Sequence, residues 1–457
     1  MKTTLSVNQK NMIARFIPRY ERMVLAVLDG MIERYERDPE YHFIDTKINI
    51  ISGQDYDSSA PEDFFKSKEV IYSWIQGRAL ESLAGHAIWM ENYFKPVSGE
   101  MRCRIRKIRQ IMQEVMESME RIRYQNRGRM FFSFSREGKP LESNHGELRE
   151  LNHIPDGSNF SDLFYSKGLF SAASYLKMSD KAEESQKYFL QVINDISNHK
   201  FITDQQSFDP KNQVVAVHGK YLQGPFMIAL SGIAEFAAVT GDSEWLKTGC
   251  EFMAHIFKHY INFDSGNEFL LYDFWEAIDA KGKPWKENGV ILSDPGHALE
   301  FVGLSLKLLL QMEKKTEYAT FVEECRDFYP KMMRHYWQQG FNQKSGGICK
   351  AYDLCGRCPL NTDMPWWSLP ETVRAAAEMI KFAPDSSAVM MEVIEQCSTA
   401  FLGKFVNPAV YSMAYQTRSS NGAPTAVIPA VPDADPGYHS GLSIITFLNI
   451  FAEIDGD

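Results

Sequence analysis

Two short segments each place a histidine just after a Pro-Gly pair. One reads Asp294-Pro-Gly-His297-Ala-Leu-Glu300, and the other, near the C-terminus, reads Asp435-Pro-Gly-Tyr-His439. Proline and glycine at these places predict that each histidine lies in the first turn of a helix. Two histidines that face one cavity from two helices could remove a proton from one face of a substrate and return it to the other.

Other reactive or aromatic side chains lie on the same helix as His297 or on other predicted helices. Glu300 follows His297 by three residues and shares its helix face. A further helix begins with Trp366, Trp367 and Glu371. Arg78 lies on the second predicted helix, within Ser73-Trp-Ile-Gln-Gly-Arg78. All of these helices are even-numbered in chain order, which favours a common site.

These residue types suit proton abstraction next to a sugar carbonyl, through an enediolate. Burial and the helix dipole lower the pKa of a histidine at a helix N-terminus, so we expect both histidines to be neutral at pH 7. Arg78 and the positive helix ends could stabilise an oxyanion. Glu300 or Glu371 could orient an imidazole or bind a hydroxyl, and a tryptophan face suits a sugar ring. The arrangement requires no metal or other cofactor.

Each of these residues has a simpler interpretation when taken alone. A single histidine or glutamate in a long helix is more often structural than catalytic. The Trp366-Trp367 pair is more often part of a core, and Arg78 is more often half of an ion pair. The prediction therefore depends on the joint placement of these residues on even-numbered helices.

Helical periodicity dominates the chain, and strand-like alternation is scarce. The pattern predicts twelve helices, at 9–36, 66–93, 100–127, 161–177, 180–199, 222–240, 242–261, 296–313, 316–339, 366–382, 385–402 and 438–455. Tight turns at 178–180, 240–242 and 383–385 alternate with long connections at 128–160, 262–295, 340–365 and 403–437. The even-numbered helices from the fourth on begin roughly 60 to 75 residues apart, which indicates a repeated helix hairpin.

Six such hairpins can close into a ring of six inner and six outer helices. We therefore expect an all-α (α/α)6 toroid with its long loops on one face, formed by residues 1–457 as a single domain. Four inner helices have a proline near their start: Pro225, Pro295, Pro365 and Pro436. Asp294 and Asp435 are candidate N-caps. The N-termini of the inner helices should thus point toward the loop face, where function usually lies.

Composition limits the classes of partner. The net charge of −10 argues against nucleic acid, and no apolar run is long enough to cross a membrane. The N-terminus lacks the apolar core of a signal peptide, and seven thinly spread cysteines fit reduced thiols. We expect a cytoplasmic protein that takes a small-molecule sugar, binds neither nucleic acid nor membrane, and is compatible with a homodimer.

Two other clusters are weaker candidates for a site. Cys349, Cys355 and Cys358 lie in one long loop, but zinc would need a fourth ligand, so free thiols are the favoured interpretation. The third predicted helix carries a basic run: Arg102, Arg104, Arg106, Lys107 and Arg109. A solvated outer face or a subunit contact explains this run better than nucleic-acid binding.

At these residues the chain resembles the N-acylglucosamine 2-epimerase family, which includes cellobiose 2-epimerases and aldose-ketose isomerases. Asp294-Pro-Gly-His-Ala-Leu-Glu300 is similar to the family's Pro-Gly-His-x-x-Glu helix start. Gly346-Gly347 followed by Trp366-Trp367-x3-Glu371 is similar to its Gly-Gly … Trp-Trp-x3-Glu segment. Pro436-Gly-Tyr-His439 resembles its C-terminal Tyr-His, and Gln76-Gly-Arg78 resembles its Gln-Ala-Arg. The likeness spans nearly the whole chain.

The resemblance implies an (α/α)6 barrel and sugar 2-epimerisation or isomerisation by two histidines. His297 and His439 would be the acid/base pair, and Arg78 would bind the oxygen of the enediolate. Glu300 and Glu371 would bind the sugar or orient the histidines. The remaining members of the expected substrate-binding set are aromatic: Trp366, Trp367 and Tyr438.

The chain also departs from the family pattern at three places. The sixth helix usually begins with Met-His followed by a Glu, but here it reads Gln223-Gly-Pro-Phe-Met-Ile-Ala-Leu-Ser231. A tryptophan expected after Pro-Gly-His is missing near Gly303, and His439-Ser-Gly-Leu replaces a His-x-Pro-Arg continuation. These changes keep the histidine pair and alter the pocket.

Four functions follow as alternatives. The first is a sugar 2-epimerase, an isomerase acting on an N-acylglucosamine/N-acylmannosamine-type sugar or a related aldose. The second is an aldose-ketose isomerase of the same family. The third is a glycoside hydrolase or lyase on the same toroid, which would need two carboxylates about 5 to 9.5 Å apart, drawn from Asp162, Asp273, Glu300 and Glu371. The fourth is a non-catalytic saccharide- or partner-binding protein.

Overall fold

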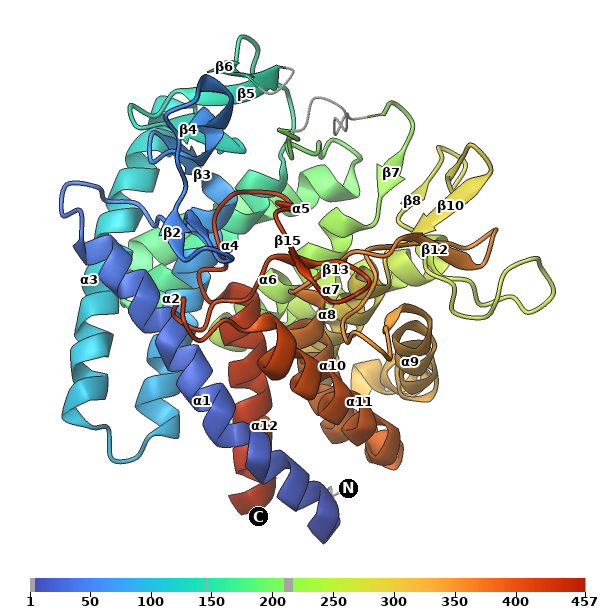
Figure 1. Ribbon diagram of the computed structural model, residues 1–457. Helices are drawn as coiled ribbons and strands as arrows, with labels where there is room; N and C mark the ends of the chain where they lie inside the picture. Colours follow the sequence, from blue (N-terminus) through green and yellow to red (C-terminus); the bar gives the residue numbers. More distant parts are fainter. Residues whose placement is uncertain (1–4, 145–146, 209–216, 457) are drawn as a thin grey trace.

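Twelve α-helices form the body of the protein in a computed structural model that describes residues 5–144, 147–208 and 217–456 (Figure 1). The first six are α1 Val7–Glu36, α2 Ser73–Tyr93, α3 Gly99–Gln125, α4 Phe160–Tyr175, α5 Ser179–Ser197 and α6 Gly224–Thr240. The other six are α7 Ser243–Tyr260, α8 Pro295–Met312, α9 Ala319–Gly340, α10 Ser368–Phe382, α11 Ser387–Ala400 and α12 Ile444–Gly456. Their number and positions confirm the predicted series.

The even-numbered helices close into a ring. Each of them contacts the next, and α12 contacts α2. Helices α4 and α10 are buried on almost every side, whereas outer helices such as α5 and α7 bury one face. For α4 this follows from sequence, because a helix without a distinct polar face must be covered, while an amphipathic helix such as α5 keeps one polar face in water. Helix α10 is buried although it carries Glu371, Arg374 and Glu378, which pair with one another or with His439 inside the ring. The fold is the expected (α/α)6 toroid.

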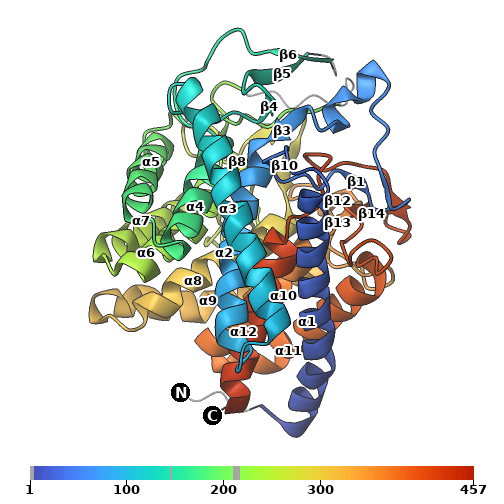
Figure 2. The same ribbon diagram turned by 90° about the vertical axis from the view of Figure 1, so that its left-hand side faces the viewer.

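The long connections gather at one end of the helices (Figures 1 and 2). In the described residues they contain fifteen short antiparallel strands, which sequence analysis did not predict. The strands are β1 Ile48–Asn49, β2 Gln54–Asp55, β3 Val70–Tyr72, β4 Ser133–Ser135, β5 Pro140–Asn144, β6 Glu147–Glu150, β7 Tyr221–Leu222, β8 Ala277–Ile278, β9 Lys286–Glu287, β10 Val290–Ser293, β11 Ala351–Asp353, β12 Cys358–Asn361, β13 Met364–Pro365, β14 Thr417–Arg418 and β15 Pro424–Thr425. Strands this short cannot show a period-two pattern.

One predicted helix began too early. The segment 66–93 was expected to be helical, but α2 begins at Ser73, and Val70–Tyr72 forms β3 and pairs with β4. Valine, isoleucine and tyrosine favour strands, and here all three are fully buried. The tight turns at 178–180, 240–242 and 383–385 lie at helix junctions as expected.

The basic run on α3 faces the neighbouring outer helix. Figure 2 shows α1 and α3 side by side on the outer surface. Arg104 Nε lies 2.6 Å from Asp29 Oδ1, and Lys107 Nζ lies 2.8 Å from Glu36 Oε2. Part of the run therefore joins two outer helices of the same chain through ion pairs.

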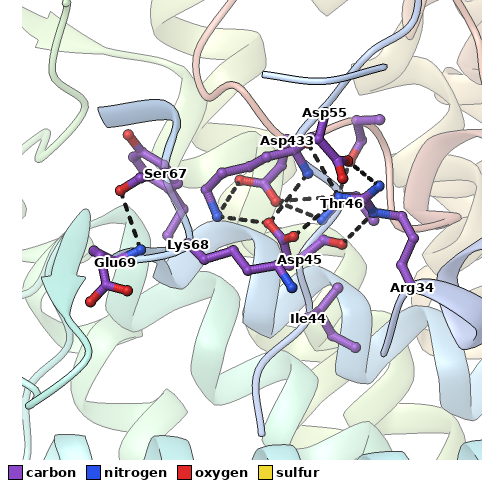
Figure 3. Close-up of polar contacts among 12 residues, drawn as sticks. Arg34, Ile44, Asp45, Thr46, Asp55, Ser67, Lys68, Glu69 and Asp433 are labelled. Carbon is purple, nitrogen blue, oxygen red and sulfur yellow. Dashed lines mark hydrogen bonds and ion pairs between the residues drawn. The ribbon is translucent and has the colours of Figure 1, made fainter. Parts of the chain in front are cut away.

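A buried polar cluster ties the N-terminal part of the chain to the loop that precedes α12 (Figure 3). Thr46 donates from its backbone N–H to Asp433 Oδ1 at 3.0 Å. Lys47 Nζ lies 3.6 Å from Asp433 Oδ2 and 3.1 Å from Asp45 Oδ1, and Arg34 of α1 binds Asp45 at 3.1 Å. We call these five residues the clasp. It fixes the end of the chain that carries the second histidine.

Candidate active site

A cavity of about 1400 Å³ opens at the N-terminal ends of the inner helices. All six of these helices, or the turns that begin them, contribute to its lining, with Arg78, Phe164, Met227, His297, Trp367 and Tyr438 as one example from each. Several helix dipoles therefore point their positive ends at one space, which favours negative charge on a bound ligand. This convergence confirms the expected arrangement of the inner helices.

The first histidine lies in the first turn of α8. The Asp294 side chain caps this helix by accepting a hydrogen bond from Gly296 N at 2.9 Å, and Pro295 is the first helical residue. His297 Nδ1 lies 2.9 Å from Glu276 Oε2 and 3.6 Å from Asp294 Oδ2. The Glu276 carboxylate is itself held, because its Oε1 accepts from Asp294 N.

The charge on His297 differs from the expectation. Burial lowers its pKa, but Asp294 and Glu276 act in the opposite direction and raise the pKa to about 9. The prediction of a neutral imidazole at pH 7 is therefore wrong for His297. Its physical reason is the pair of carboxylates, of which Glu276 was not among the candidate residues.

The second histidine lies in a π-helical turn, Tyr438–Ser443, that leads into α12. The N-cap of this turn is Gly437 and not the expected Asp435, because the helical turn begins two residues later than Pro436 would place it. The Asp435 carboxylate still accepts the backbone N–H groups of Tyr438, His439 and Ser440 at 2.9, 3.3 and 2.9 Å. These hydrogen bonds fix the backbone from which the His439 imidazole projects. Turns of the π type are frequent at functional sites.

A second carboxylate orients His439. Its Nδ1 atom lies 2.7 Å from Glu371 Oε1, to which Ser443 Oγ also donates at 2.9 Å. Arg374 Nη2 lies 2.5 Å from the other oxygen of Glu371. Burial raises the pKa of Glu371, but Arg374 and His439 outweigh it and lower the pKa to about 2. Glu371 thus takes the orienting role that was open between it and Glu300.

The rings of the two histidines both contact the same tryptophan. The Trp367 ring centroid lies 5.3 Å from that of His297 and 6.0 Å from that of His439. Trp366 is 7% exposed and contacts His439 with its ring edge at 5.5 Å. Trp366 therefore packs mainly as support, while Trp367 neighbours both imidazoles and lines the cavity with them.

Glu300 lines the cavity without a hydrogen-bond partner among the described residues. Burial and the nearby Glu371 raise its pKa. Ligand atoms of Glu300, Glu371 and His439 lie within 4.8 Å of one another. Arg374, Ser443 and the imidazole already engage the Glu371 oxygens, so this group suits a charge network better than a cation.

Arg78 is half-buried and is held by aromatic rings. Its guanidinium lies 4.2 Å from the centroid of Phe164 and 5.5 Å from those of Trp74 and Tyr438. No carboxylate of the described residues forms an ion pair with it, and its Nε atom has no hydrogen-bond partner there. The simpler interpretation, half of an ion pair, therefore does not hold for Arg78. Its cation faces the cavity instead.

Three contributors were missed by sequence reasoning: Glu276, Lys350 and Arg374. Lys350 Nζ lies 2.6 Å from Asp294 Oδ2, at the edge of the cavity. Arg374 passes Gly303, where a Cβ atom would lie 3.0 Å from its Nε. Gly303 stands near the place where the family pattern has a tryptophan, and this small residue is the one sequence feature that relates to Arg374. Glu276 and Lys350 lie in long connections that have no diagnostic pattern.

The cysteine cluster shows no metal-binding geometry in the described residues. Cys349 is buried, Cys355 and Cys358 are exposed, and all three are free thiols. They do not occur in the group of side chains close enough to share an ion. Free thiols remain the better interpretation.

Comparison with known sequences decides the family. The sequence profile of the N-acylglucosamine 2-epimerase (GlcNAc 2-epimerase) family matches residues 166–440, which include both histidines. The chain belongs to this family. The expectation of an isomerase of the carbohydrate epimerase class is thereby confirmed at the level of the family. A search of curated proteins gives no match.

Solved structures share the toroid with this N-acylglucosamine 2-epimerase family member. A cellobiose 2-epimerase from Spirochaeta thermophila DSM 6192 has a TM-score of 0.68 at 10% identity, over 98% of this chain and 100% of that one. A sugar epimerase from a ruminal bacterium has a TM-score of 0.63 at 12% identity, over 94% and 98%. A D-mannose isomerase has a TM-score of 0.60 at 13% identity, over 92% and 97%. Identities this low establish the fold alone.

The helices give no sign of a membrane span. Within the described residues, none is both long and apolar enough to cross a bilayer.

Proposed function

We propose that this protein is a sugar 2-epimerase that moves the C2 proton with His297 and His439, through an enediolate. The observation that carries the proposal is that both imidazoles line one cavity and contact the ring of the same residue, Trp367. Each imidazole has its Nδ1 atom on a carboxylate, which leaves Nε2 as the nitrogen available to a substrate.

The proposed reaction divides into a base and an acid step. One imidazole takes the C2 proton, the electrons of the C–H bond form the C1–C2 double bond, and the carbonyl oxygen becomes negative. The other imidazole then returns a proton to the opposite face of C2, and the carbonyl re-forms. Arg78 and the positive helix ends stabilise the oxyanion between these steps.

The charge on His297 suggests which step it performs. Because Asp294 and Glu276 raise the pKa of His297 to about 9, His297 holds a proton at pH 7. It is therefore the natural acid for one direction of the reaction, with His439 as the base. Turnover exchanges the two protonation states, so the reverse direction uses them in the opposite roles.

An aldose-ketose isomerase is the second candidate. It would use the same base and enediolate but return the proton to C1 instead of C2. The 1400 Å³ cavity exceeds the ~300–1,000 Å³ of ordinary small-molecule sites, so it can hold a monosaccharide or a longer sugar in either reaction.

The positions of the four candidate carboxylates disfavour the hydrolase alternative. Asp162 is fully buried and paired with Arg129 at 2.8 Å, and Asp273 is fully buried and paired with Arg357 at 2.7 Å. Of the four, only Glu300 is among the described residues that line the cavity. A hydrolase would require two carboxylates that both reach the scissile bond.

Proton NMR in D2O tests the proposal. The purified protein is incubated with N-acetylglucosamine, N-acetylmannosamine, glucose, mannose, fructose and cellobiose, beside its His297→Asn and His439→Asn variants. We expect loss of the C2 proton signal with wild type only, and the product identifies epimerisation or isomerisation. Sugar-dependent chemical-shift changes without exchange on any of these sugars would instead support a binding protein.

A further inference from the structure

A lysine is completely buried beside the cavity. Lys167, on α4, has 0% exposure, and its Nζ atom lies 3.1 Å from the Tyr438 hydroxyl and 3.4 Å from Glu81 Oε2. Its stem passes α6 at Gly232, where a Cβ atom would lie 2.8 Å from Lys167 Cγ. A buried ammonium group is costly without partners, so this placement calls for an explanation beyond packing.

The hydrogen bond between Lys167 and Tyr438 has one possible direction. An ammonium group has three donors and no acceptor, so the Tyr438 oxygen accepts. The hydroxyl therefore keeps its own proton for a different acceptor, and no described residue is found to accept it. Because Tyr438 lines the cavity, a bound substrate can supply that acceptor.

The charges on both groups support this direction. Burial lowers the pKa of Lys167, but Glu81 and Tyr438 raise it above its ordinary value, so the amine is charged. Burial and Glu81 raise the pKa of Tyr438 despite the opposing effects of Lys167 and Arg78, so the phenol keeps its proton at pH 7. Glu235 on α6 acts on the pKa of Lys167 in the same direction as Glu81.

A second donor lies next to the Tyr438 ring. The Arg78 guanidinium is 5.5 Å from the Tyr438 ring centroid, and the Tyr438 ring is 4.9 Å from that of His439. Tyr438 therefore adjoins an imidazole proposed to move the proton, and Arg78 adjoins Tyr438 in the same cavity. Two fixed donors at the place where charge develops are the usual components of an oxyanion site.

We infer that Lys167 is a positioning residue that holds the Tyr438 hydroxyl as a donor, together with Arg78, to the substrate oxygen that becomes negative. This inference rests on the proposed enediolate chemistry. As the base takes the carbon-bound proton, the carbonyl π electrons move onto this oxygen, and Tyr438 and Arg78 donate hydrogen bonds to it without losing their protons. When the proton returns to carbon, the electrons move back and the carbonyl re-forms. Lys167 keeps its protons throughout.

A double-mutant cycle of Lys167→Met and Tyr438→Phe tests the inference. The readout is kcat and KM for deuterium exchange, with the sugar of the NMR panel that wild type exchanges. We expect Tyr438→Phe to lower kcat by about 100- to 1,000-fold with little change in KM. Lys167→Met should lower kcat by about tenfold, and the double variant should be no slower than Tyr438→Phe alone, because the lysine acts through the hydroxyl.

Two further variants separate this role from a structural one. Lys167→Met/Glu81→Gln removes the cation together with its carboxylate partner, and its Tm shows whether the fold is kept. Lys187→Met, at a lysine whose side chain is 73% exposed, is the matched control and should match wild type. A Tyr438→Phe variant as fast as wild type overturns the inference whatever the lysine variants do, and so do additive effects in the cycle. Absence of exchange by wild type on every sugar overturns the proposed chemistry instead.

Discussion

Each of the two histidines has a carboxylate at its Nδ1 atom, but the two pairs are not equivalent. Glu371 is shared with Arg374, whose cation offsets part of the carboxylate charge. His297 instead lies near two carboxylates, Glu276 and Asp294, and only Lys350 opposes them. The two carboxylates, rather than the imidazole itself, keep His297 protonated at pH 7.

Replacing the carboxylate behind His297 should reduce turnover more than binding. In Glu276→Gln the amide can no longer stabilise an imidazolium, so we expect kcat for deuterium exchange to fall by about 100-fold or more, with KM changed little. The matched control is Glu287→Gln, at an exposed residue of β9 in the same connection. Equal losses in both variants would show that the connection tolerates no change and that orientation of His297 is not the cause.

The raised pKa of His297 gives the stability a pH dependence of known sign. Its pKa is about 9 in the folded protein and ~6.5 in an unfolded chain. Because the folded value is the higher one, this stabilisation is fully present below about pH 6.5 and is lost as the pH rises through about 9. We expect wild type to lose about 3 kcal/mol more unfolding free energy than His297→Asn between these limits. Urea unfolding across the pH range measures it, and parallel curves for the two proteins would contradict it.

At the scale of the element, the π-helical turn before α12 depends on close packing against α2. A Cβ atom at Gly441 would lie 2.3 Å from Cε1 of the His86 ring, which is fully buried. The Ser82 hydroxyl donates to the carbonyl of Pro436 at 2.9 Å and fixes the start of the same turn. Small side chains here let α2 and the turn approach, and this approach sets the position of His439.

Replacing Gly441 with a larger residue should therefore displace the π-helical turn that carries His439. We expect Gly441→Ala to lower the unfolding free energy by about 1–3 kcal/mol, as for overpacked cores, and to reduce exchange activity as well. Gly403→Ala is the control, because it lies in a second π-helical turn, Phe401–Phe405, with no atom within 4 Å of the added Cβ. Adding His86→Ala to Gly441→Ala should restore part of the activity. Failure of this rescue would show that the clash is not the cause.

At the scale of the whole molecule, the clasp joins segments from opposite ends of the sequence. Thr46 and Lys47 bind Asp433, and the loop then continues to Asp435 and the second histidine. The ring thus closes through buried charge as well as through the contact of α12 with α2. That all 457 residues form one domain stays a prediction, which a single cooperative unfolding transition would support.

Replacing Lys47, the lysine of the clasp, should lower the unfolding free energy. Lys47→Met leaves Asp433 buried without its cation, so we expect a loss of about 3–5 kcal/mol in unfolding free energy, measured by urea titration. Lys381→Met breaks an exposed ion pair with Glu453 and should cost about 1 kcal/mol or less. Adding Asp433→Asn to Lys47→Met should recover part of the loss. Equal small effects of Lys47→Met and Lys381→Met would mean that the clasp does not hold the chain ends together.

The sequence by itself determined the features that depend on local pattern. Helical periodicity placed all twelve helices, alternating short and long links indicated the ring of hairpins, and Pro-Gly motifs placed His297 and His439 in first turns. These signals are legible because they arise between residues a few positions apart. The predicted start of a helix was wrong where a short buried strand, Val70–Tyr72, preceded it.

The tertiary structure alone decided the partners of these residues and thus their charge. Glu276 reaches His297 from a long connection, Glu371 meets His439 across 68 positions, and Lys167 meets Tyr438 across 271. None of these contacts can be recognised from neighbouring residues in the sequence, because each depends on how separate elements pack against one another. Interactions between charges in a buried site depend strongly on distance, so the protonation of His297 could be known only once its two carboxylates were placed in space.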